Sequence, residues 1–182
     1  MKRFLLPAVA ALLSLAGCSE PAGTPLAPDA APSASLTSSL GGVLEFTSLP
    51  DLNGTRSASK RISAASGGWV ELNGFRVDVP AGALPQDTVV SIVLPQNAVL
   101  GRRVLAEFEP HGIQFNTPVT LSFPLTGVSL PLNGSLEVGR WENGGWTSLG
   151  GTVSLNGTRL SATTPHFSTY AARGGAYIMG GG

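Results

Sequence analysis

The sequence has few charged side chains and no excess of either sign. Lysine and arginine number 11, aspartate and glutamate also number 11, and together they make up 12% of the 182 residues. A protein that binds nucleic acid needs a concentrated basic surface to neutralise phosphates. This composition contains no such surplus, so nucleic acid is not an expected partner.

Cysteine and histidine are also scarce. One cysteine excludes an intramolecular disulfide, so stability has to come from buried apolar surface. The two histidines, His111 and His166, are far apart in the chain, whereas metal sites of cysteine and histidine need clusters. Glu107 and Glu109 share one face of an expected strand, but calcium requires more oxygen ligands than two side chains supply. We interpret them as a solvated acidic face and expect no metal and no cofactor.

Motifs typical of catalysis are missing as well. The chain lacks the Gly-x-Ser-x-Gly turn of hydrolases, the phosphate loop, Gly-x-Gly-x-x-Gly and His-Glu-x-x-His. Beyond the first few residues its only lysine is Lys60. His111 lies in an expected turn, and the sequence indicates no partner that would orient it as a base. The sequence therefore predicts a protein that is not an enzyme.

The N-terminus carries the most specific pattern in the chain. Lys2 and Arg3 precede an apolar run over residues 4–15, which suits the secretion machinery but is too short to span roughly 30 Å of hydrocarbon. The run ends in Leu-Ala-Gly-Cys, with small residues directly before Cys18. This segment resembles the lipobox of bacterial lipoproteins.

That resemblance implies that residues 1–17 are a signal peptide and that Cys18 becomes the lipidated N-terminus, with diacylglycerol on its thiol and a further acyl chain such as palmitate. Several acyl chains give durable membrane anchoring, whereas one gives only marginal binding. Ser19 stands where an aspartate would indicate inner-membrane retention, so we expect the outer membrane if the cell has two membranes. An ordinary signal peptide with an incidental cysteine is the alternative.

Residues 18–66 are expected to form a flexible linker. The stretch is rich in proline, alanine, serine, threonine and glycine, and such a composition buries too little apolar area to offset the entropy of ordering. Residues 43–46, Val-Leu-Glu-Phe, interrupt it and are a candidate strand at the edge of the following domain. At the other end of the chain, the glycine-rich tail 173–182 is expected to be frayed.

Residues 67–172 have the pattern of an all-β domain. Short runs of β-forming residues alternate with turn signals, without helical periodicity of useful length. The clearest unit is residues 69–79, where Asn73-Gly74 is the preferred pair for a two-residue type I′ turn. That turn creates one apolar face and one face with an opposite-charge pair. The predicted pairs are Leu72–Phe75, Val70–Val77 and Glu71–Arg76.

Two further Asn-Gly turns predict hairpins. The turn at residues 156–157 sets Val153 opposite Leu160, and the turn at residues 143–144 sets Trp141 opposite Trp146. The other expected strands cover residues 89–94, 104–109, 119–123, 136–141, 146–149 and 167–172. Prolines fall at the expected strand edges, where a missing N–H is tolerated. About eight to nine strands favour an antiparallel two-layer β-sandwich.

Three stretches of this domain occur together in a familiar order. They are Gly-Gly-Trp-Val with Val-Pro-Ala-Gly-Ala-Leu at residues 67–84, Glu-Pro-His-Gly-Ile-Gln-Phe with Pro-Val at 109–119, and His-Phe-Ser-Thr-Tyr at 166–170. They resemble the ZU-five domain, first recognised in zonula-occludens, netrin-receptor and ankyrin proteins, and its bacterial envelope relatives. The resemblance covers nearly all of residues 67–172. It implies a β-sandwich that serves as an interaction module, and no partner-binding residue carries over.

Some eukaryotic relatives in that family cut their own backbone within a His-Phe-Ser motif, which this sequence has as His166-Phe167-Ser168. In that chemistry the Ser168 hydroxyl attacks the Phe167 carbonyl in an N→O acyl shift, with strain lowering the barrier and His166 assisting proton transfer. The cutting relatives carry a substantial domain after the serine, whereas only 14 residues follow here. The three residues can instead open the last strand of the sandwich.

The sequence thus predicts a lipid-anchored protein of the cell envelope with a non-catalytic interaction or structural module, whose partner is an unidentified envelope protein. The alternative is a module that binds carbohydrate or peptidoglycan. In that case Trp69, Trp141 and Trp146 stack on sugar rings, provided that they share an exposed face. A second alternative is autoproteolysis between Phe167 and Ser168.

Overall fold

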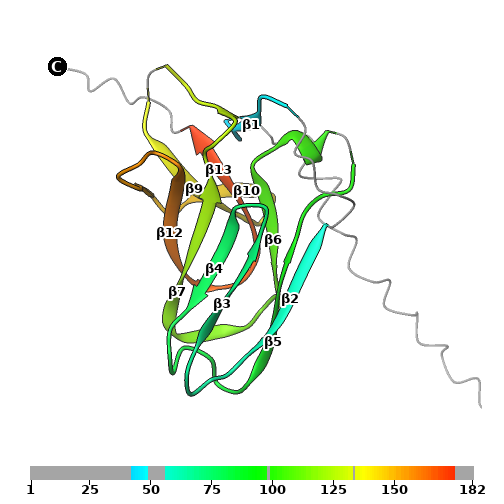
Figure 1. The fold of residues 1–182 in the computed structure, drawn as a ribbon, viewed down its shortest axis with the longest axis vertical. Coiled ribbons are helices and arrows are strands. Elements are labelled where there is room, and N and C mark those ends of the chain that lie inside the picture. The colour runs from blue at the N-terminus through cyan, green and yellow to red at the C-terminus, as the bar shows by residue number, and fades with distance from the viewer. Residues whose placement is uncertain (1–41, 49–55, 98, 133, 175–182) are drawn as a thin grey trace, which may run out of the picture. The chain divides into compact units, whose positions relative to one another are not determined.

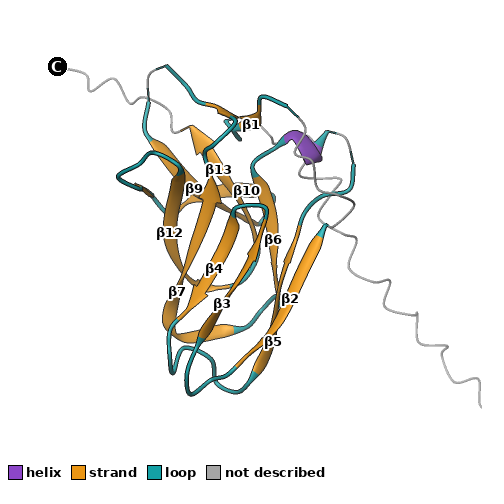
Figure 2. Cartoon of the chain, in the orientation of Figure 1, coloured by secondary structure: helices purple, strands orange, loops and turns teal. Residues whose placement is uncertain are grey.

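A computed structural model of the chain describes residues 42–48, 56–97, 99–132 and 134–174. The described part is all-β apart from one 3-10 turn, η1 (Leu100–Arg102), as Figure 2 shows. Its 13 strands are β1 (Glu45–Phe46), β2 (Ser57–Ile62), β3 (Gly68–Leu72), β4 (Phe75–Val79), β5 (Thr88–Val93), β6 (Leu105–Glu109), β7 (Gln114–Pro124), β8 (Val128–Ser129), β9 (Leu136–Glu142), β10 (Gly145–Ser148), β11 (Thr152–Val153), β12 (Arg159–His166) and β13 (Thr169–Gly174).

The strands form two large antiparallel sheets that pack face to face (Figure 1). One sheet has six strands in the order β10-β9-β13-β6-β5-β2, and the other has five in the order β11-β12-β7-β4-β3. β1 and β8 form a separate short pair. The predicted fold class, an all-β antiparallel two-layer sandwich, is confirmed. The strand count exceeds the prediction because β1, β8 and β11 have two residues each and because β1 and β2 precede residue 67.

The hairpin β3–β4 has the predicted register. Leu72 pairs with Phe75, and Glu71 pairs with Arg76 across the turn. Asn73 and Gly74 have φ angles of 50° and 84°, the left-handed region that a type I′ turn requires. The other two predicted pairings are also confirmed, Trp141 with Trp146 and Val153 with Leu160.

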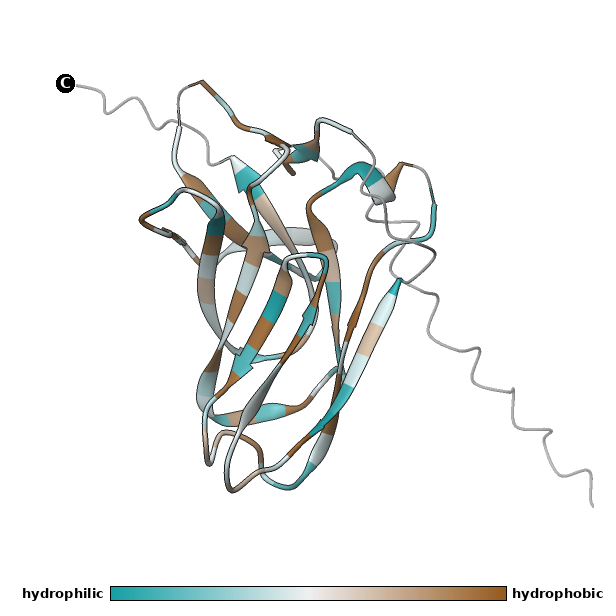
Figure 3. Cartoon of the chain, in the orientation of Figure 1, coloured by the Kyte–Doolittle hydropathy of each residue, from teal (hydrophilic) through white to brown (hydrophobic). Residues whose placement is uncertain are grey.

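The core lies between the two sheets and takes alternate residues from most strands, so that hydropathy alternates along them in Figure 3. Aromatic rings run through it in edge contact. The centre of the Phe123 ring lies 5.7 Å from that of Phe75 and 6.2 Å from that of Phe108. The ring centres of Phe108 and Tyr170 are 5.8 Å apart. Phe167 stacks on Phe108 with 6.1 Å between the ring centres and is buried in the core.

The predicted linker is wrong over its described C-terminal part. Residues 57–62 form β2, which pairs with β5 along its whole length. Its side chains are mostly polar and exposed, so the sequence of β2 resembles a linker although its backbone belongs to the six-stranded sheet. The candidate strand at residues 43–46 does join the domain, with Glu45 and Phe46 in β1.

Residues 42–46, which we call the inserted segment, lie between β13 and the residues that lead into β6. The Leu44 N–H donates to the Ala172 carbonyl and the Val104 N–H donates to the Leu44 carbonyl, both at 2.9 Å. The Gly174 N–H donates to the Gly42 carbonyl at 2.8 Å. The side chain of Leu44 is buried in the main core. The first residues described are therefore part of the sandwich.

Three smaller predictions also need correction. The last strand does not begin at Phe167 as predicted. β12 continues to His166, and the last strand, β13, begins at Thr169. Arg173 and Gly174, which were predicted to belong to the frayed tail, form the end of β13. Pro118 lies inside β7 instead of at its edge. It is tolerated there because pairing with β12 is interrupted by a bulge that separates the pairs Gln114–His166 and Val119–Thr164.

The predicted signal peptide (1–17), Cys18, the rest of the linker before residue 42 and the tail beyond residue 174 lie outside the described residues. Within the described residues, no helix has the length and apolar character needed to cross a bilayer.

Candidate functional site

The outer face of the five-stranded sheet carries a charged lattice of Glu71, Arg76, Asp78 and Arg159. The Arg76 guanidinium forms a bidentate hydrogen bond to Asp78, with Nε 2.8 Å from Oδ2 and Nη2 2.5 Å from Oδ1. Its Nη1 lies 3.3 Å from Glu71 Oε2, and Arg159 Nη2 lies 3.1 Å from Glu71 Oε1. The predicted pair of Glu71 and Arg76 is thus one link in a longer network.

The lattice fixes the charge and the orientation of Arg76. The pKa of Arg76 is raised above its ordinary value, and the largest cause is the hydrogen bond with Asp78. Partial desolvation lowers this pKa, whereas Glu71 raises it further. A bidentate contact also fixes the plane of the guanidinium. Arg76 is consequently a permanently charged and rigidly held group.

Trp69 lies beside this lattice with 47% of its surface exposed. Arg76 Cζ is 4.5 Å from the centre of its ring, and Lys60 Nζ is 5.0 Å from it. Both cations are within the range of cation–π attraction. We call this group, Lys60, Trp69 and Arg76, the Trp69 site.

The Trp69 site connects the edges of the two sheets. Lys60 belongs to β2 and Trp69 to β3, which are edge strands of the six-stranded and five-stranded sheets. The two strands meet at one corner, where Ser63 bridges Gly67. Trp69 is one of the residues predicted from the sequence, whereas Lys60 is not, because the predicted linker covers β2. The Trp-Val-Glu-Leu alternation of β3, which turns Trp69 outward with Glu71, was the signal for an exposed ring.

The three tryptophans do not share one exposed face. Trp141 is buried, and its ring centre lies 5.1 Å from that of Trp146 in an edge-on arrangement. Arg173 Cζ lies 5.9 Å from the Trp146 ring. This pair belongs to β9 and β10 of the six-stranded sheet, whereas Trp69 belongs to the other sheet. A stacking surface made of all three rings is therefore not formed.

The His-Phe-Ser motif forms the connection between β12 and β13. His166 Nδ1 lies 3.2 Å from the Phe167 carbonyl oxygen, and the Ser168 hydroxyl donates to the Trp141 carbonyl at 2.9 Å. Among the described residues only Asn73 and Asn143 have positive φ outside glycine, so the motif is not held in the left-handed region. The imidazole therefore contacts the Phe167 carbonyl oxygen, while the Ser168 hydroxyl is hydrogen-bonded to a carbonyl of β9.

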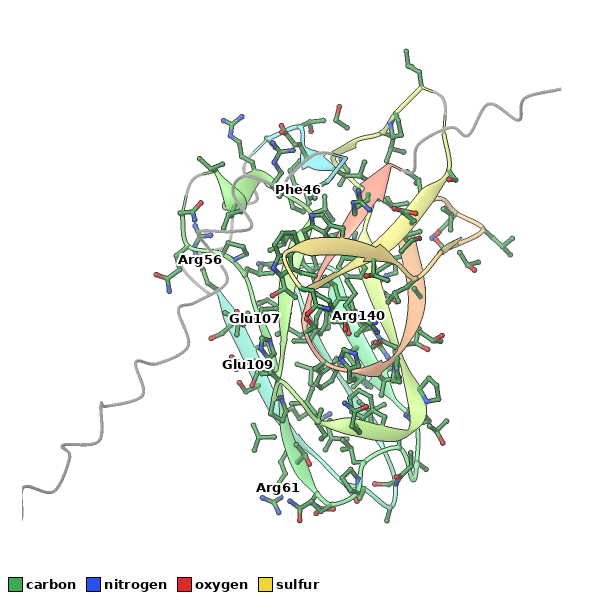
Figure 4. The ribbon with its side chains drawn as sticks, turned by 180° about the vertical axis from the view of Figure 1, so that it is seen from behind. Phe46, Arg56, Arg61, Glu107, Glu109 and Arg140 are labelled. Atoms are coloured by element: carbon green, nitrogen blue, oxygen red, sulfur yellow. The ribbon has the colours of Figure 1, made fainter. Side chains whose placement is uncertain are left out.

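A polar cluster lies beside this motif. Glu142 accepts from Arg140 Nη2 at 2.6 Å through Oε2, and its Oε1 is 3.3 Å from His166 Nε2. The Tyr170 hydroxyl lies 2.8 Å from Thr164 Oγ1 and donates to the His166 carbonyl at 2.5 Å. The Arg140 side chain, which is labelled in Figure 4, is only 15% exposed. The contact of Glu142 with His166 has no signature in the sequence, because it joins strands of different sheets.

Burial raises the pKa of Tyr170 to about 12. Ionisation would place a phenolate in the core, where it loses its hydration, and the hydrogen bond with Thr164 offsets only part of that cost. Tyr170 is therefore a neutral hydrogen-bonding group at ordinary pH.

One of the two acidic residues of β6, Glu107, has a structural partner. Glu107 Oε1 lies 3.2 Å from His111 Nε2, which supplies the orienting partner that the sequence did not indicate. Glu109 lies on the same strand, as Figure 4 shows. Over residues 42–48, 56–97, 99–132 and 134–174, no group of three or more His, Cys, Asp or Glu side chains is arranged to hold a metal ion.

A narrow hollow at one end of the sandwich is too small for an organic ligand. It is lined by Phe46, Arg56, Phe75 and Leu105 among others, and its volume is about 10 Å³. That space suits at most one water molecule. Figure 4 labels Phe46 and Arg56 at this end.

Comparison with known proteins gives no family assignment. No protein-family model matches the chain, and no curated protein matches it. The resemblance to the ZU-five domain and the lipoprotein lipobox remain predictions from the sequence.

Proposed function

We propose that this chain is a lipid-anchored protein of the cell envelope whose β-sandwich is a non-catalytic protein-interaction module centred on the Trp69 site. The observation that supports this proposal is a half-exposed indole with two cations close to its ring, one of which is fixed by two carboxylates. Tryptophan and arginine are the residues most enriched at energetically dominant positions of protein interfaces.

The geometry of the Trp69 site favours binding in two ways. Arg76 and Trp69 are already held by contacts within the domain, so binding a partner would cost little side-chain entropy at these two residues. β2 and β3 beside the ring are edge strands of their sheets, so an extended segment of a partner has backbone groups to pair with. The exposed Lys60 and Arg61 on β2 favour a partner with acidic side chains.

Site-specific photocrosslinking in intact cells tests the interaction. A photoreactive residue in place of Arg61 is expected to give a discrete crosslinked species, and Trp69→Ala is expected to abolish it. The same probe at Thr163, exposed on the outer face of β12, serves as the control and should give none. Equal crosslinking at both positions would contradict the proposal.

The lipid anchor is tested separately at Cys18. We expect Cys18→Ser to abolish metabolic labelling with palmitate and to release the protein from the membrane fraction. Photocrosslinking of released protein in the periplasm would still report on the Trp69 site. Labelling that persists in the variant would exclude Cys18 as the acceptor.

Carbohydrate or peptidoglycan binding is the alternative function. It has to use Trp69 alone or the outer part of Trp146, since Trp141 is buried. A sugar that stacks on Trp69 would share the ring with Lys60 and Arg76, whose cationic groups already lie close to it. Retention on immobilised peptidoglycan that is lost with Trp69→Ala or Trp146→Ala would favour this alternative.

Self-cleavage is the second alternative, and the contact of His166 with the Phe167 carbonyl is the observation in its favour. The Ser168 hydroxyl would first have to leave the Trp141 carbonyl before it could attack. Intact-mass measurement of the purified protein is decisive. A fragment that begins at Ser168 and is absent from Ser168→Ala would favour cleavage, whereas one uncut species would exclude it.

A further inference from the structure

Exposed apolar side chains gather at one end of the sandwich. We call it the Gly42 end, and it comprises Gly42, the turn 73–74, the described residues of the segments 94–104 and 124–135, the segment 149–158, and Gly174. Seven large hydrophobic side chains are exposed in the described part of the chain, and five of them lie at this end. The five are Val99, Leu130, Leu132, Val153 and Leu155.

Two loops supply most of this surface. Leu132 is 99% exposed and Leu155 is 110% exposed, so neither side chain packs on the domain. The stretches 125–136 and 143–158, which contain these loops, have no charged residue. Exposed loops of a soluble domain ordinarily carry polar or charged tips, whereas a leucine there leaves its apolar surface in water and forgoes the favourable free energy of burial.

The same end receives the chain from the predicted anchor. Gly42 is hydrogen-bonded to Gly174, and a Cβ on Gly174 would lie 3.3 Å from Pro131 Cγ. Pro131 stands between Leu130 and Leu132, so the leucine loop borders the point where the chain enters the sandwich. Phe46 is the last residue of the inserted segment. Figure 4 shows Phe46 near one end of the sandwich and Arg61 at the opposite end.

We propose that the Gly42 end is a second membrane contact, at which Leu130, Leu132 and Leu155 insert into the interfacial layer of the bilayer. This inference depends on the proposed lipid anchor at Cys18. The part of the predicted linker between Cys18 and the inserted segment, residues 19–41, has 23 residues. A flexible chain of that length has a root-mean-square end-to-end distance of about 24–29 Å, so the loops would remain near the lipid surface.

Tethering explains why a few leucines suffice. A linker of this length converts a weak contact into an intramolecular one with a high effective concentration. Apolar insertion by uncharged loops needs no anionic lipid, and it should not weaken when salt screens charges. A basic docking surface would behave in the opposite way.

Fluorescent probes on the lipidated full-length protein test the contact. Cys18 is acylated in that protein, so Leu132→Cys or Leu155→Cys provides one reactive thiol for an environment-sensitive dye. In phosphatidylcholine vesicles we expect a blue shift and quenching by brominated acyl chains at both positions, unchanged at high salt. The control Gln86→Cys, exposed in the loop before β5 at the opposite end, should show neither.

Three outcomes would overturn the inference. Probes at residues 132 and 155 that stay as hydrated as the probe at residue 86 would show that the loops do not insert. A blue shift without quenching by brominated lipid, which grows with protein density, would indicate contact with a second copy instead. Quenching that disappears at high salt would indicate electrostatic docking.

The experiment distinguishes an error in the proposed lipid anchor from an error in the proposed insertion of the loops. If Cys18 is not lipidated, unmodified protein will not float with vesicles at all. If the anchor is present and the loops do not insert, flotation is retained and the lipid quenching is lost. Leu132→Asp with Leu155→Asp is expected to keep flotation and the fold, since both side chains are exposed, while a dye at Leu130→Cys loses its quenching.

Discussion

At the scale of single residues, Tyr170 shows how burial sets the chemistry of a group. Its hydroxyl is hydrogen-bonded to Thr164 and to the His166 carbonyl, and its ring packs on Phe108. The folded state therefore holds the phenol in its neutral form. Its pKa of about 12 lies above the value of 10.0 expected for an exposed tyrosine.

The first prediction concerns alkaline pH. Because the folded pKa is the higher one, the stability that neutral Tyr170 contributes is fully present below pH 10 and is lost as pH rises through 12. The loss amounts to about 2–3 kcal/mol. Tyr170→Phe should be less stable than the parent below pH 10, and this difference should shrink toward pH 12. Urea unfolding at both limits measures it, and a difference independent of pH would contradict the assignment.

The second prediction compares two glycines that both have positive φ. A Cβ on Gly74 would meet Pro124 Cβ at 2.9 Å, whereas a Cβ on Gly157 would meet nothing within 4 Å. Gly157→Ala should lower the free energy of unfolding by about 1 kcal/mol through backbone strain alone. Gly74→Ala should cost about 2–3 kcal/mol because the contact adds to it. Equal losses in thermal unfolding would show that Pro124 can move away.

At the scale of secondary-structure elements, local and non-local causes can be separated. The hairpin β3–β4 was predictable because the Asn-Gly turn and the alternation of apolar residues agree within eleven residues. β2 was not predictable, since its exposed Ser-Ala-Ser-Lys-Arg run gains its place from pairing with β5 about 30 residues away. The second half of β12 was missed for the same reason, because its serines and threonines pair with β7.

The inserted segment gives the third prediction. Leu44 is buried in the core although the sequence around it has the composition of a linker. Leu44→Ala should lower the free energy of unfolding by about 2–3 kcal/mol, as expected for a buried leucine. Leu132→Ala, at a fully exposed leucine, is the matched control and should change it by less than about 0.5 kcal/mol. Both values can be measured by denaturant unfolding without lipid, and equal effects would show that residues 42–46 are not part of the folded unit.

At the scale of the whole molecule, polar contacts as well as apolar ones join the two sheets. Glu142 belongs to β9 of the six-stranded sheet and His166 to β12 of the other. The Arg140 side chain that shares Glu142 is only 15% exposed. Loss of the carboxylate would leave a nearly buried cation without its partner.

The fourth prediction follows from that arrangement. Glu142→Ala should lower the free energy of unfolding by about 1–3 kcal/mol, because Arg140 loses a charged hydrogen-bond partner. Glu109→Ala, at an exposed carboxylate of β6, should have almost no effect. Calorimetry of the two variants side by side would measure the difference, and a similar melting temperature would show that Arg140 reaches water when Glu142 is absent.

The candidate site could be predicted only in part. The outward direction of Trp69 and its neighbours Glu71 and Arg76 followed from the alternation in one hairpin. Lys60 could not be placed, because its approach to Trp69 depends on how two sheets meet at a corner. The same limit applies to Glu142 beside His166. Contacts within a hairpin are encoded locally, and contacts between sheets are not.

The inserted segment has a mechanical consequence. If Cys18 carries the proposed lipid anchor, a force on that anchor would enter the sandwich at Gly42 and load the backbone hydrogen bonds to Ala172, Gly174 and Val104. The bonds to β13 lie side by side along the segment, so a pull directed along the strand would stretch them together in shear instead of opening them one after another. Under the proposed anchoring, the sandwich would then resist a pull from the membrane at the point where the described chain begins.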